Sequence, residues 1–182
     1  MRIIGGQHHR RILRPPAGLP VRPTTDKAKE ALFNVLNHLV DFTGLRVLDL
    51  FAGTGSISYE FASRGAALVV AVDKHPRCIR YMKTVKEALE LDKLVCLQGD
   101  VFRYLKQGRD VFDLVFADPP FSLPGLADIP DQVFSSQLLS REGILVLEHS
   151  DSQRFQAHPH FLKEKKYSKV HFSFFSQEGN IQ

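Results

Sequence analysis

The stretch that decides the fold is Val47-Leu48-Asp49-Leu50-Phe51-Ala52-Gly53-Thr54-Gly55-Ser56. Its apolar residues up to Leu50 predict a strand buried on both faces, as in parallel sheets. Gly53 and Gly55 allow a sharp turn and a close approach of a ligand, because no side chain stands in the way. The amphipathic segment 57–62 predicts a helix whose first N–H groups face that ligand. The stretch therefore predicts an open α/β sheet with a nucleotide-like cofactor at the end of its first strand.

Two departures from a dinucleotide-binding turn indicate which cofactor this is. The third glycine of G-x-G-x-x-G is replaced by Ser58, and Asp49 lies at the strand tip, where it would repel a pyrophosphate. A carboxylate suits a ligand with a cationic end instead. S-adenosyl-L-methionine (SAM) carries an ammonium and a sulfonium but no phosphate, so we expect SAM as the cofactor. The structural alternative is a strand-to-helix turn that holds no ligand.

Length and composition limit the class of protein. The 182 residues, 43% of them hydrophobic, suffice for one well-buried domain and not for two. The net charge of +4 suggests an anionic partner. Cys78 and Cys96 have no CxxC spacing, which favours buried, reduced thiols. We find no apolar run of membrane-spanning length and no signal peptide, so we expect a cytoplasmic protein without a membrane partner or a metal.

The first 22 residues form a basic segment that contains no acid. Gly5-Gly6 can form the tip of a hairpin between residues 2–4 and 11–13. We expect residues 1–22 to be an arm or hairpin that contacts RNA phosphates, and residues 23–182 to be a single domain. The alternative is a solvated arm packed on the domain edge. The predicted RNA-contacting residues are Arg2, Arg10, Arg11, Arg14 and Arg22.

Further strands end in acids. The predicted strand 67–72 ends at Asp73, about twenty residues after the first glycine, where a carboxylate accepts from ribose hydroxyls in such folds. The strand 94–97 precedes Asp100, which either accepts from an adenine amine or caps the helix 101–106. The remaining predicted elements are helices 28–39 (with N-cap candidates at 24–26), 77–91 and 132–139, strands 113–117 and 144–147, and a C-terminal hairpin of 161–167 and 169–176.

The motif Asp118-Pro119-Pro120-Phe121 follows the strand 113–117. The prolines remove two donors, and nearby carbonyl groups are left free to accept hydrogen bonds. An exocyclic base amine needs acceptors such as these and the Asp118 carboxylate, because its lone pair is otherwise delocalised into the ring. Phe121 would stack on the base. The motif therefore predicts methyl transfer to a base amine, and its structural alternative is a rigid strand exit.

Together these motifs resemble the RsmD-type guanine-N2 methyltransferases of bacterial small-subunit ribosomal RNA, within the class I SAM-dependent methyltransferases. The resemblance also covers the arm Arg2-Ile-Ile-Gly-Gly and the block Arg22-Pro-Thr-Thr-Asp26 with Glu30-Ala-Leu-Phe-Asn34. It implies a Rossmann-like α/β fold with a seven-stranded, mostly parallel sheet and an antiparallel last strand. The resemblance also implies that residues 23–182 are a single methyltransferase domain.

The resemblance also implies roles for individual residues. Asp118, Pro119, Pro120 and Phe121 would hold the target amine, which is the N2 of one guanine in 16S rRNA within an assembling small subunit. We expect the protein to act on it as a monomer. The implied cofactor-binding residues are Asp49, Phe51, Ala52, Gly53, Thr54, Gly55, Asp73, Lys74, Asp100 and Val101, with Thr24 and Thr25 approaching from the helix side.

Three alternatives stay open. An adenine-N6 methyltransferase of RNA or DNA would use the same D-P-P-F motif, although 182 residues leave no room for a DNA target-recognition domain. A non-catalytic rRNA-binding assembly protein could keep the fold, but it would be free to lose Asp49, the glycines and D-P-P-F. A nicotinamide-dependent oxidoreductase is disfavoured by Asp49 and Ser58.

Overall fold

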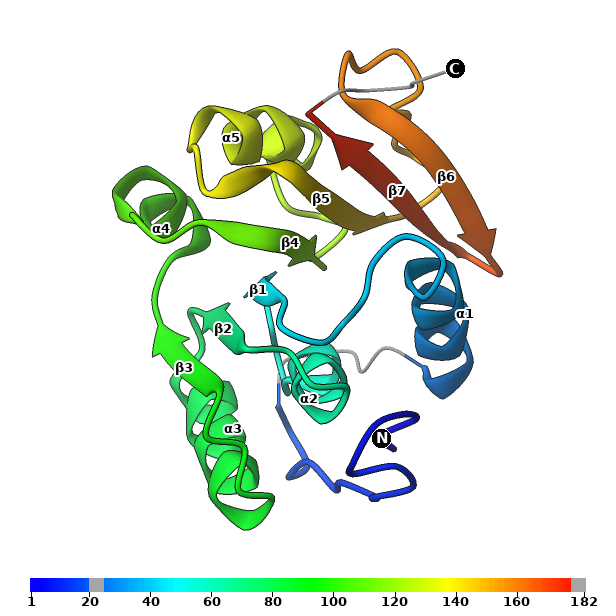
Figure 1. Ribbon diagram of the computed structural model, residues 1–182. Helices are drawn as coiled ribbons and strands as arrows, with labels where there is room; N and C mark the ends of the chain where they lie inside the picture. The colour runs from blue at the N-terminus through cyan, green and yellow to red at the C-terminus, as the bar shows by residue number, and fades with distance from the viewer. Residues whose placement is uncertain (20–24, 178–182) are drawn as a thin grey trace.

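A computed structural model describes residues 1–19 and 25–177 of the protein. Seven strands form one sheet in the order β3-β2-β1-β4-β5-β7-β6 (Figure 1). Strands β1 to β5 pair in parallel, and β7 is antiparallel to both β5 and β6. This confirms the predicted mostly parallel sheet with a reversed last strand. The strands are β1 (Arg46–Leu50), β2 (Leu68–Asp73), β3 (Leu94–Gln98), β4 (Phe112–Ala117), β5 (Leu139–His149), β6 (Phe161–Tyr167) and β7 (Val170–Ser176).

Helices cover both faces of the sheet (Figure 1). One layer contains α1 (Asp26–Leu36), α2 (Ser56–Ser63) and α3 (Pro76–Ala88), and the other contains α4 (Val101–Gln107) and α5 (Ile129–Ser135), preceded by the 3-10 turn η1 (Leu126–Asp128). On β1, Val47 packs into the first layer, whereas Leu48 and Leu50 pack into the second. Because both faces are covered, the strands read as continuous apolar runs in the sequence.

The strand order places a crevice at the centre of the sheet. From β1 the chain runs outward to β2 and β3, and then returns to lay β4 and β5 on the other side of β1. In such open sheets, ligands bind beyond the carboxyl ends of the strands where the order reverses. The ends of β1 and β4 are therefore the expected ligand site.

Several predicted boundaries were wrong by a few residues. Helix α3 ends at Ala88 instead of residue 91, because Glu90 adopts a positive φ of 52°. Helix α5 begins three residues earlier than predicted, with Pro130 in its first turn, where the missing N–H costs little. It also ends earlier, since Gln137 has a φ of 59° and Leu139 already opens β5. Helix α1 ends at residue 36 instead of 39.

The N-terminal residues 1–13 form a hairpin with one isolated antiparallel bridge. The Ile3 N–H donates to the Arg11 carbonyl at 2.9 Å, and the Ile3 side chain is buried. The hairpin is attached to α2, because the carboxylate of Glu60 accepts the backbone N–H groups of Ile4 and Gly5 at 2.9 and 2.7 Å. The basic segment thus lies against the sheet's first helical layer.

Candidate active site

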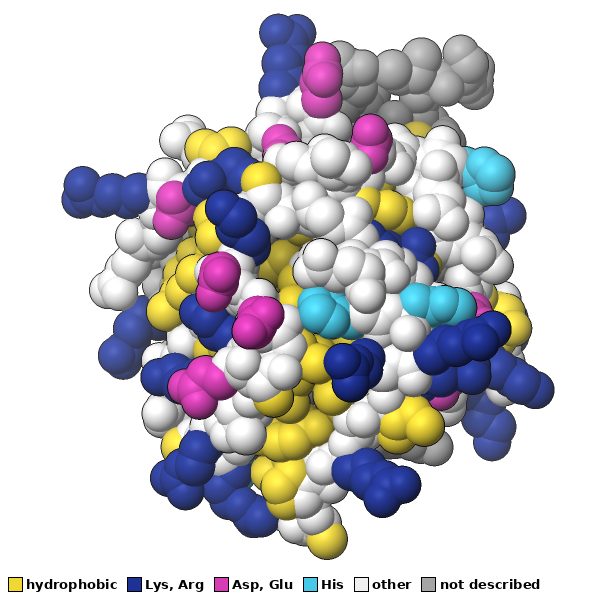
Figure 2. Space-filling view, turned by 60° about the horizontal axis from the view of Figure 1, so that its bottom comes forward, with side chains coloured by type: hydrophobic (Ala, Val, Ile, Leu, Met, Phe, Trp, Pro, Cys, Tyr) yellow, Lys and Arg dark blue, Asp and Glu magenta, His cyan; other side chains and the backbone are white. Residues whose placement is uncertain are grey.

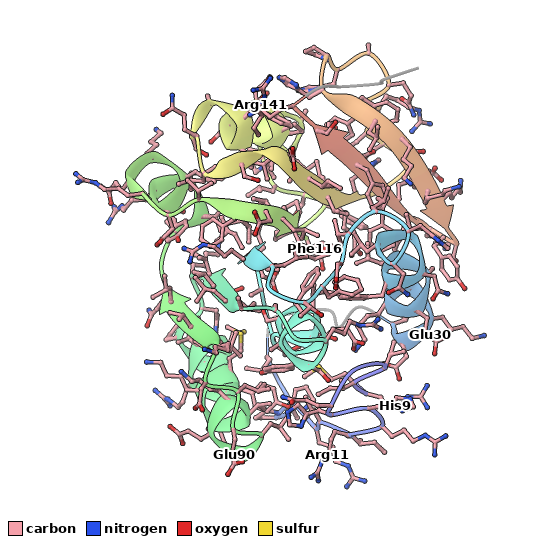
Figure 3. The ribbon with its side chains drawn as sticks, in the orientation of Figure 1. His9, Arg11, Glu30, Glu90, Phe116 and Arg141 are labelled. Carbon is pink, nitrogen blue, oxygen red and sulfur yellow. The ribbon has the colours of Figure 1, made fainter. Side chains whose placement is uncertain are left out.

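Three carboxyl side chains gather at the carboxyl ends of β1, β4 and β5. Asp118 and Glu148 directly follow the last paired residues of β4 and β5, so they lie side by side, and Asp49 is near the end of β1. Two residues earlier, Phe116 and Val146 pack into the layer of α1, α2 and α3. Because side chains alternate along a strand, Asp118 and Glu148 face the same layer. Figure 3 shows Phe116 near the centre of the molecule, which locates this carboxyl row.

The carboxyl row has no basic partner within residues 1–19 and 25–177: no lysine, arginine or histidine there forms an ion pair with it. Asp49 is almost fully buried, and the Ser58 hydroxyl donates a hydrogen bond to it. Burial raises the pKa of Asp49 to about 7 despite the Ser58 hydrogen bond, and the neighbouring charge of Asp118 adds to the rise. A cationic ligand would stabilise these acids in their ionised form.

Asp118 and Glu148 form the other part of the row. Asp118 is half-buried as a residue, but its carboxyl group lies deep enough for burial to raise its pKa. Glu148 is only 5% exposed, and burial together with the charge of Asp118 raises its pKa as well. In the described part of the chain, the Oε2 atom of Glu148 has no hydrogen-bond partner. The pair therefore retains a proton near neutral pH when no ligand is bound.

The glycine-rich turn after β1 is strained. Phe51 has a φ of 61°, which is uncommon for a bulky residue, and Gly53 follows with a φ of 55°. The Ala52 N–H donates to the carbonyl of Val72 at 3.0 Å, and the Gly53 N–H donates to Asp73 Oδ2 at 2.8 Å. These bonds tie the turn to the end of β2. Strain of this kind persists only where the surroundings impose it, and it concentrates at ligand-binding turns.

Gly55 is required by its own conformation and by packing. Its φ is 79°, and a Cβ there would lie 2.8 Å from both Met82 Sδ and Tyr59 Cζ. The positive φ agrees with the predicted sharp turn, and the packing of α2 against α3 adds a second reason for glycine, while the predicted contact with the cofactor stays a prediction. Gly55 also precedes the first residue of α2, so the free N–H groups of that helix open toward the turn.

The remaining predicted cofactor residues lie around the same strand ends. Thr54 and Asp73 are buried, while Lys74 is exposed. The Asp73 oxygens accept the backbone N–H groups of Gly53 and His75 at 2.8 and 2.7 Å. A carboxylate offers about four acceptor positions, so Asp73 can still bind hydroxyl groups.

Two predicted cofactor residues cap helices in the structure. Asp100 is exposed, and its Oδ1 accepts the Arg103 N–H at 2.9 Å, so Asp100 caps α4, while its contact with the adenine stays a prediction. The neighbouring Val101 is buried in the α4–α5 layer. Thr25 caps α1 by accepting the Ala28 N–H at 3.2 Å. The predictions for Thr24 and Arg22 lie outside the described residues.

The D-P-P-F motif places acceptors and an aromatic ring at the end of β4. The Asp118 N–H donates to the Leu50 carbonyl at 3.3 Å, which joins β4 to β1. The Pro120 carbonyl accepts from Leu123 N–H at 2.8 Å, whereas the Pro119 carbonyl accepts no hydrogen bond from any described residue. The Asp118 carboxyl group and the Pro119 carbonyl are thus the available acceptors. Phe121 is 42% exposed and can receive a flat ligand.

The predicted RNA-contacting arginines differ in their surroundings. Arg2 pairs with Asp26 and Glu30 at 3.8 Å, whereas Arg10, Arg11 and Arg14 are exposed and form no ion pair with any described residue. Figure 3 shows Arg11 on the hairpin at the lower edge of the molecule. In Figure 2, where this edge comes forward, Lys and Arg side chains lie around the rim of the face and hydrophobic atoms occupy its middle.

The described residues contain neither a membrane-spanning helix nor a metal-binding cluster. No described helix has the length and apolar character needed to cross a membrane. The described residues also contain no group of three or more histidine, cysteine, aspartate or glutamate side chains placed so that they could hold a metal ion, and the carboxyl row is no exception.

Comparison with known proteins places the chain in a family. The model of the family described as conserved hypothetical protein 95 matches residues 1–176. The chain belongs to this family. Relatives with curated names show that it is the RsmD-type family predicted from the sequence.

Three relatives illustrate the similarity. Bacillus subtilis YlbH, provisionally named an rRNA methyltransferase, is 37% identical over 153 residues, covering 82% of each chain. Escherichia coli ribosomal RNA small subunit methyltransferase D is 29% identical over 148 residues, covering 81% of this chain and 74% of its own. The solved structure of Escherichia coli yhhF, provisionally named a methyltransferase, superimposes with a TM-score of 0.85 at 27% identity, covering 99% of both chains.

This RsmD-type protein is a class I methyltransferase that uses SAM. The site agrees with that cofactor, because a buried row of acids without a basic partner fits a ligand that carries an ammonium and a sulfonium. Two residues of the site were not among the predicted ones. The sequence suggested only a missing glycine at Ser58, yet its hydroxyl donates to Asp49. No sequence pattern indicated a role for Glu148, whose Oε2 atom has no hydrogen-bond partner among the described residues.

Proposed function

We propose that this chain transfers a methyl group from SAM to the exocyclic N2 amine of one guanine in small-subunit rRNA. The coarser function, methylation of ribosomal RNA, is supported by the family, whose curated members are named for it. The proposal also includes the form of the substrate, which is rRNA in an assembling small subunit, and a monomeric enzyme.

The observation that carries this proposal is the pair of free acceptors at the end of β4. The Asp118 carboxylate and the Pro119 carbonyl can each accept one N–H of an exocyclic amine, while Phe121 stacks on the base. Two accepted hydrogen bonds orient the nitrogen lone pair toward an electrophile. SAM, when bound, supplies that electrophile as a methyl group on a positively charged sulfur.

The residues then have defined tasks. Asp49, Asp73 and the strained turn would hold the cofactor, with Asp49 beside its cationic end. The bound cofactor would supply the methyl group, and the pair of electrons of its carbon–sulfur bond would stay with the sulfur as the nitrogen–carbon bond forms. The amine becomes positively charged and loses one proton, which the Asp118 carboxylate can accept and pass to solvent. Burial raises the pKa of Asp118 in the ligand-free protein, and the cationic cofactor would favour the carboxylate form that accepts the proton.

The hairpin is the proposed RNA-contacting element. Arg10, Arg11 and Arg14 are exposed cations without ion-pair partners among the described residues, so they are free to contact phosphates. Phosphate contacts of this kind fix the position of the RNA but carry no sequence information. The groups around Asp118 must therefore determine which base is selected.

The function is tested on rRNA from cells that lack this protein. Mass spectrometry of digested rRNA should show one guanosine that has lost an N2-methyl group. Purified protein with labelled SAM should restore that modification on small subunits from the same cells. A missing N6-methyladenosine instead would favour the adenine alternative. If all modifications were unchanged, the non-catalytic assembly role would replace the proposal.

A further inference from the structure

Glu148 is a buried acid that the proposed chemistry does not use. It is 5% exposed, and in the described residues nothing bonds its Oε2 atom. Burying a carboxyl group without a partner is costly, so proteins seldom retain one unless a ligand or a mechanism needs it.

The register of the sheet places Glu148 next to Asp118. Ala117 and Leu147 form the last residue pair between β4 and β5. Asp118 and Glu148 are the next residues of the two parallel chains. On its other side Glu148 pairs with Phe172 of β7, which is buried and apolar. At this register, β7 thus offers Glu148 an apolar side chain, whereas β4 is followed by the carboxyl group of Asp118.

The two adjacent carboxyl groups are complementary to the hydrogen-bond donors on one edge of guanine, and not to the same edge of adenine. In guanine the N2 amine is adjacent to the ring N1–H, so two kinds of donor lie side by side. In adenine the N6 amine is adjacent to N1, which carries a lone pair and no hydrogen. A carboxylate next to Asp118 therefore finds a donor in guanine and a lone pair in adenine, which it would repel.

We propose that Glu148 is the specificity-determining residue that selects guanine by accepting the ring N1–H while Asp118 accepts from the N2 amine. This proposal rests on the proposed function and names the residue that chooses between the two bases. In the ligand-free protein, Glu148 holds a proton because of its burial and of the Asp118 charge. The cationic cofactor and the N1–H donor both favour the carboxylate, which is the form that accepts.

The contact would also assist the reaction. Withdrawal of the N1 hydrogen toward Glu148 shifts electron density from N1 into the ring and onto N2. The N2 lone pair then becomes more available to the methyl group. Loss of Glu148 should consequently lower kcat more than it raises KM, since the benefit grows as the transition state forms.

The test compares wild-type protein with Glu148→Gln on two RNAs. One contains guanosine at the target position, and the other contains 2-aminopurine, which keeps the 2-amine but lacks the N1–H. Each is supplied as free RNA or in a reconstituted particle, whichever the wild-type protein methylates. Wild-type kcat/KM should be about 5- to 150-fold higher for guanosine, the range for a good base-edge hydrogen-bond pair. In Glu148→Gln this ratio should fall toward one, because the amide can accept from the guanine N1–H or donate to the N1 lone pair of 2-aminopurine, whereas a carboxylate only accepts.

Two controls separate recognition from folding. Glu142→Gln makes the same change on an exposed residue near the start of β5 and should leave the ratio at the wild-type value. SAM affinity by calorimetry should be within about threefold of wild type in Glu148→Gln. If that variant does not fold, Glu148→Asp keeps an acceptor and should retain the guanosine preference at a lower rate.

The outcomes are distinct. An unchanged guanosine to 2-aminopurine ratio in folded Glu148→Gln, or a lost preference in Glu148→Asp, would overturn the role of Glu148 and leave the proposed function intact. If wild-type protein methylates no guanine amine in any RNA, the proposed function fails, and this inference fails with it.

Discussion

At the scale of single residues, the site consists of buried acids that no lysine or arginine among the described residues neutralises. Asp49, Asp118 and Glu148 sit on one face of neighbouring strands, and burial raises the pKa of each. Most proteins neutralise buried acids with a lysine or arginine. Here the compensating charge is expected from the cofactor, so the residues that destabilise the empty protein are those that favour its ligand.

Asp118→Ala should abolish methyl transfer while changing SAM affinity only a few-fold. The substitution removes an acceptor from the target amine but leaves the glycine turn and Asp73 in place. Loss of one such positioned group costs about 10²–10³ in kcat. Single-turnover assays would measure the rate, and calorimetry would measure cofactor binding. A variant that methylates at the normal rate would remove Asp118 from the proposed catalytic role.

Some single residues could be predicted from the sequence and others could not. The carboxylate at the tip of β1 and the acceptors of D-P-P-F followed from strand ends and proline chemistry, and the structure brings them together. The proximity of Glu148 to Asp118 depends on the register of β4 with β5, which no local pattern contains. The position of Asp100 after a strand and before a helix predicts both an adenine contact and a helix cap. Only the structure shows that it caps α4.

At the scale of elements, the N-terminal hairpin is held by a buried ion pair. Lys29 on α1 and Glu60 on α2 are buried, with 3.7 Å between Nζ and Oε2. Lys29 also donates to the Arg2 carbonyl at 2.5 Å, and Glu60 accepts from two hairpin N–H groups. The pair thus joins three elements that are distant in the sequence. Apolar periodicity alone did not reveal it.

Glu60→Gln should loosen the hairpin. The neutral amide leaves the Lys29 charge buried without its partner, a change that typically costs about 3–5 kcal/mol. Hydrogen exchange of the Ile4 and Gly5 amides should accelerate more than that of the sheet. The control is Glu30→Gln, which removes an exposed partner of Arg2 worth at most about 1 kcal/mol. Equal exchange rates in Glu60→Gln and wild type would show that other contacts hold the hairpin.

Replacing Arg10 and Arg11 together with alanine should weaken RNA binding and lower its salt dependence. Each lost phosphate contact reduces the slope of log K against log salt by about 0.7–0.9. Filter binding across a salt series would measure this slope. The charge-matched control is the pair Arg109 and Arg141, which are exposed and lie far from the hairpin; Figure 3 shows Arg141 at the upper edge. The same slope in both double variants would exclude the hairpin from the RNA interface.

Element boundaries were predicted less well than element types, for local reasons. Leu138 and Leu139 fit both a helical and a strand pattern, and the decision depends on the pairing of Leu139 with Phe112 across the sheet. Pro130 lies outside the predicted helix 132–139, although it occupies the first turn of α5. Long-range pairing thus overrides local propensity at the edges of elements.

At the scale of the whole molecule, the fold concentrates carboxyl groups without basic partners in a protein whose net charge is positive. The formal charge is +4, yet the carboxyl row at the strand ends contains no base. Exposed arginines on the hairpin can attract the RNA, while the row attracts the cationic cofactor. The two ligands are thus recognised by opposite charges in different parts of one domain.

The same charge distribution determines how stability depends on pH. The folded-state pKa of Asp49 is about 7, whereas an unfolded aspartate has a pKa of about 3.9. Because the folded protein then binds more protons than the unfolded chain, the free energy of unfolding falls as pH rises between these values. From pH 5.5 to 8, Asp49 alone should reduce it by about 2 kcal/mol, or about 4–8 °C in Tm. Asp118 and Glu148, whose pKa values are also raised, act in the same direction.

Thermal unfolding of the cofactor-free protein across this pH range would measure the effect. Asp49→Asn cannot ionise, so its Tm should fall less steeply than that of wild type. SAM should flatten the wild-type slope, because a cation beside Asp49 favours the carboxylate. Calorimetry in two buffers of different ionisation enthalpy should accordingly detect proton release on SAM binding near pH 6.5, and less release in Asp49→Asn. If both proteins lost stability equally with pH and SAM bound without proton release, the carboxyl row would not be the site of the cationic end of the cofactor.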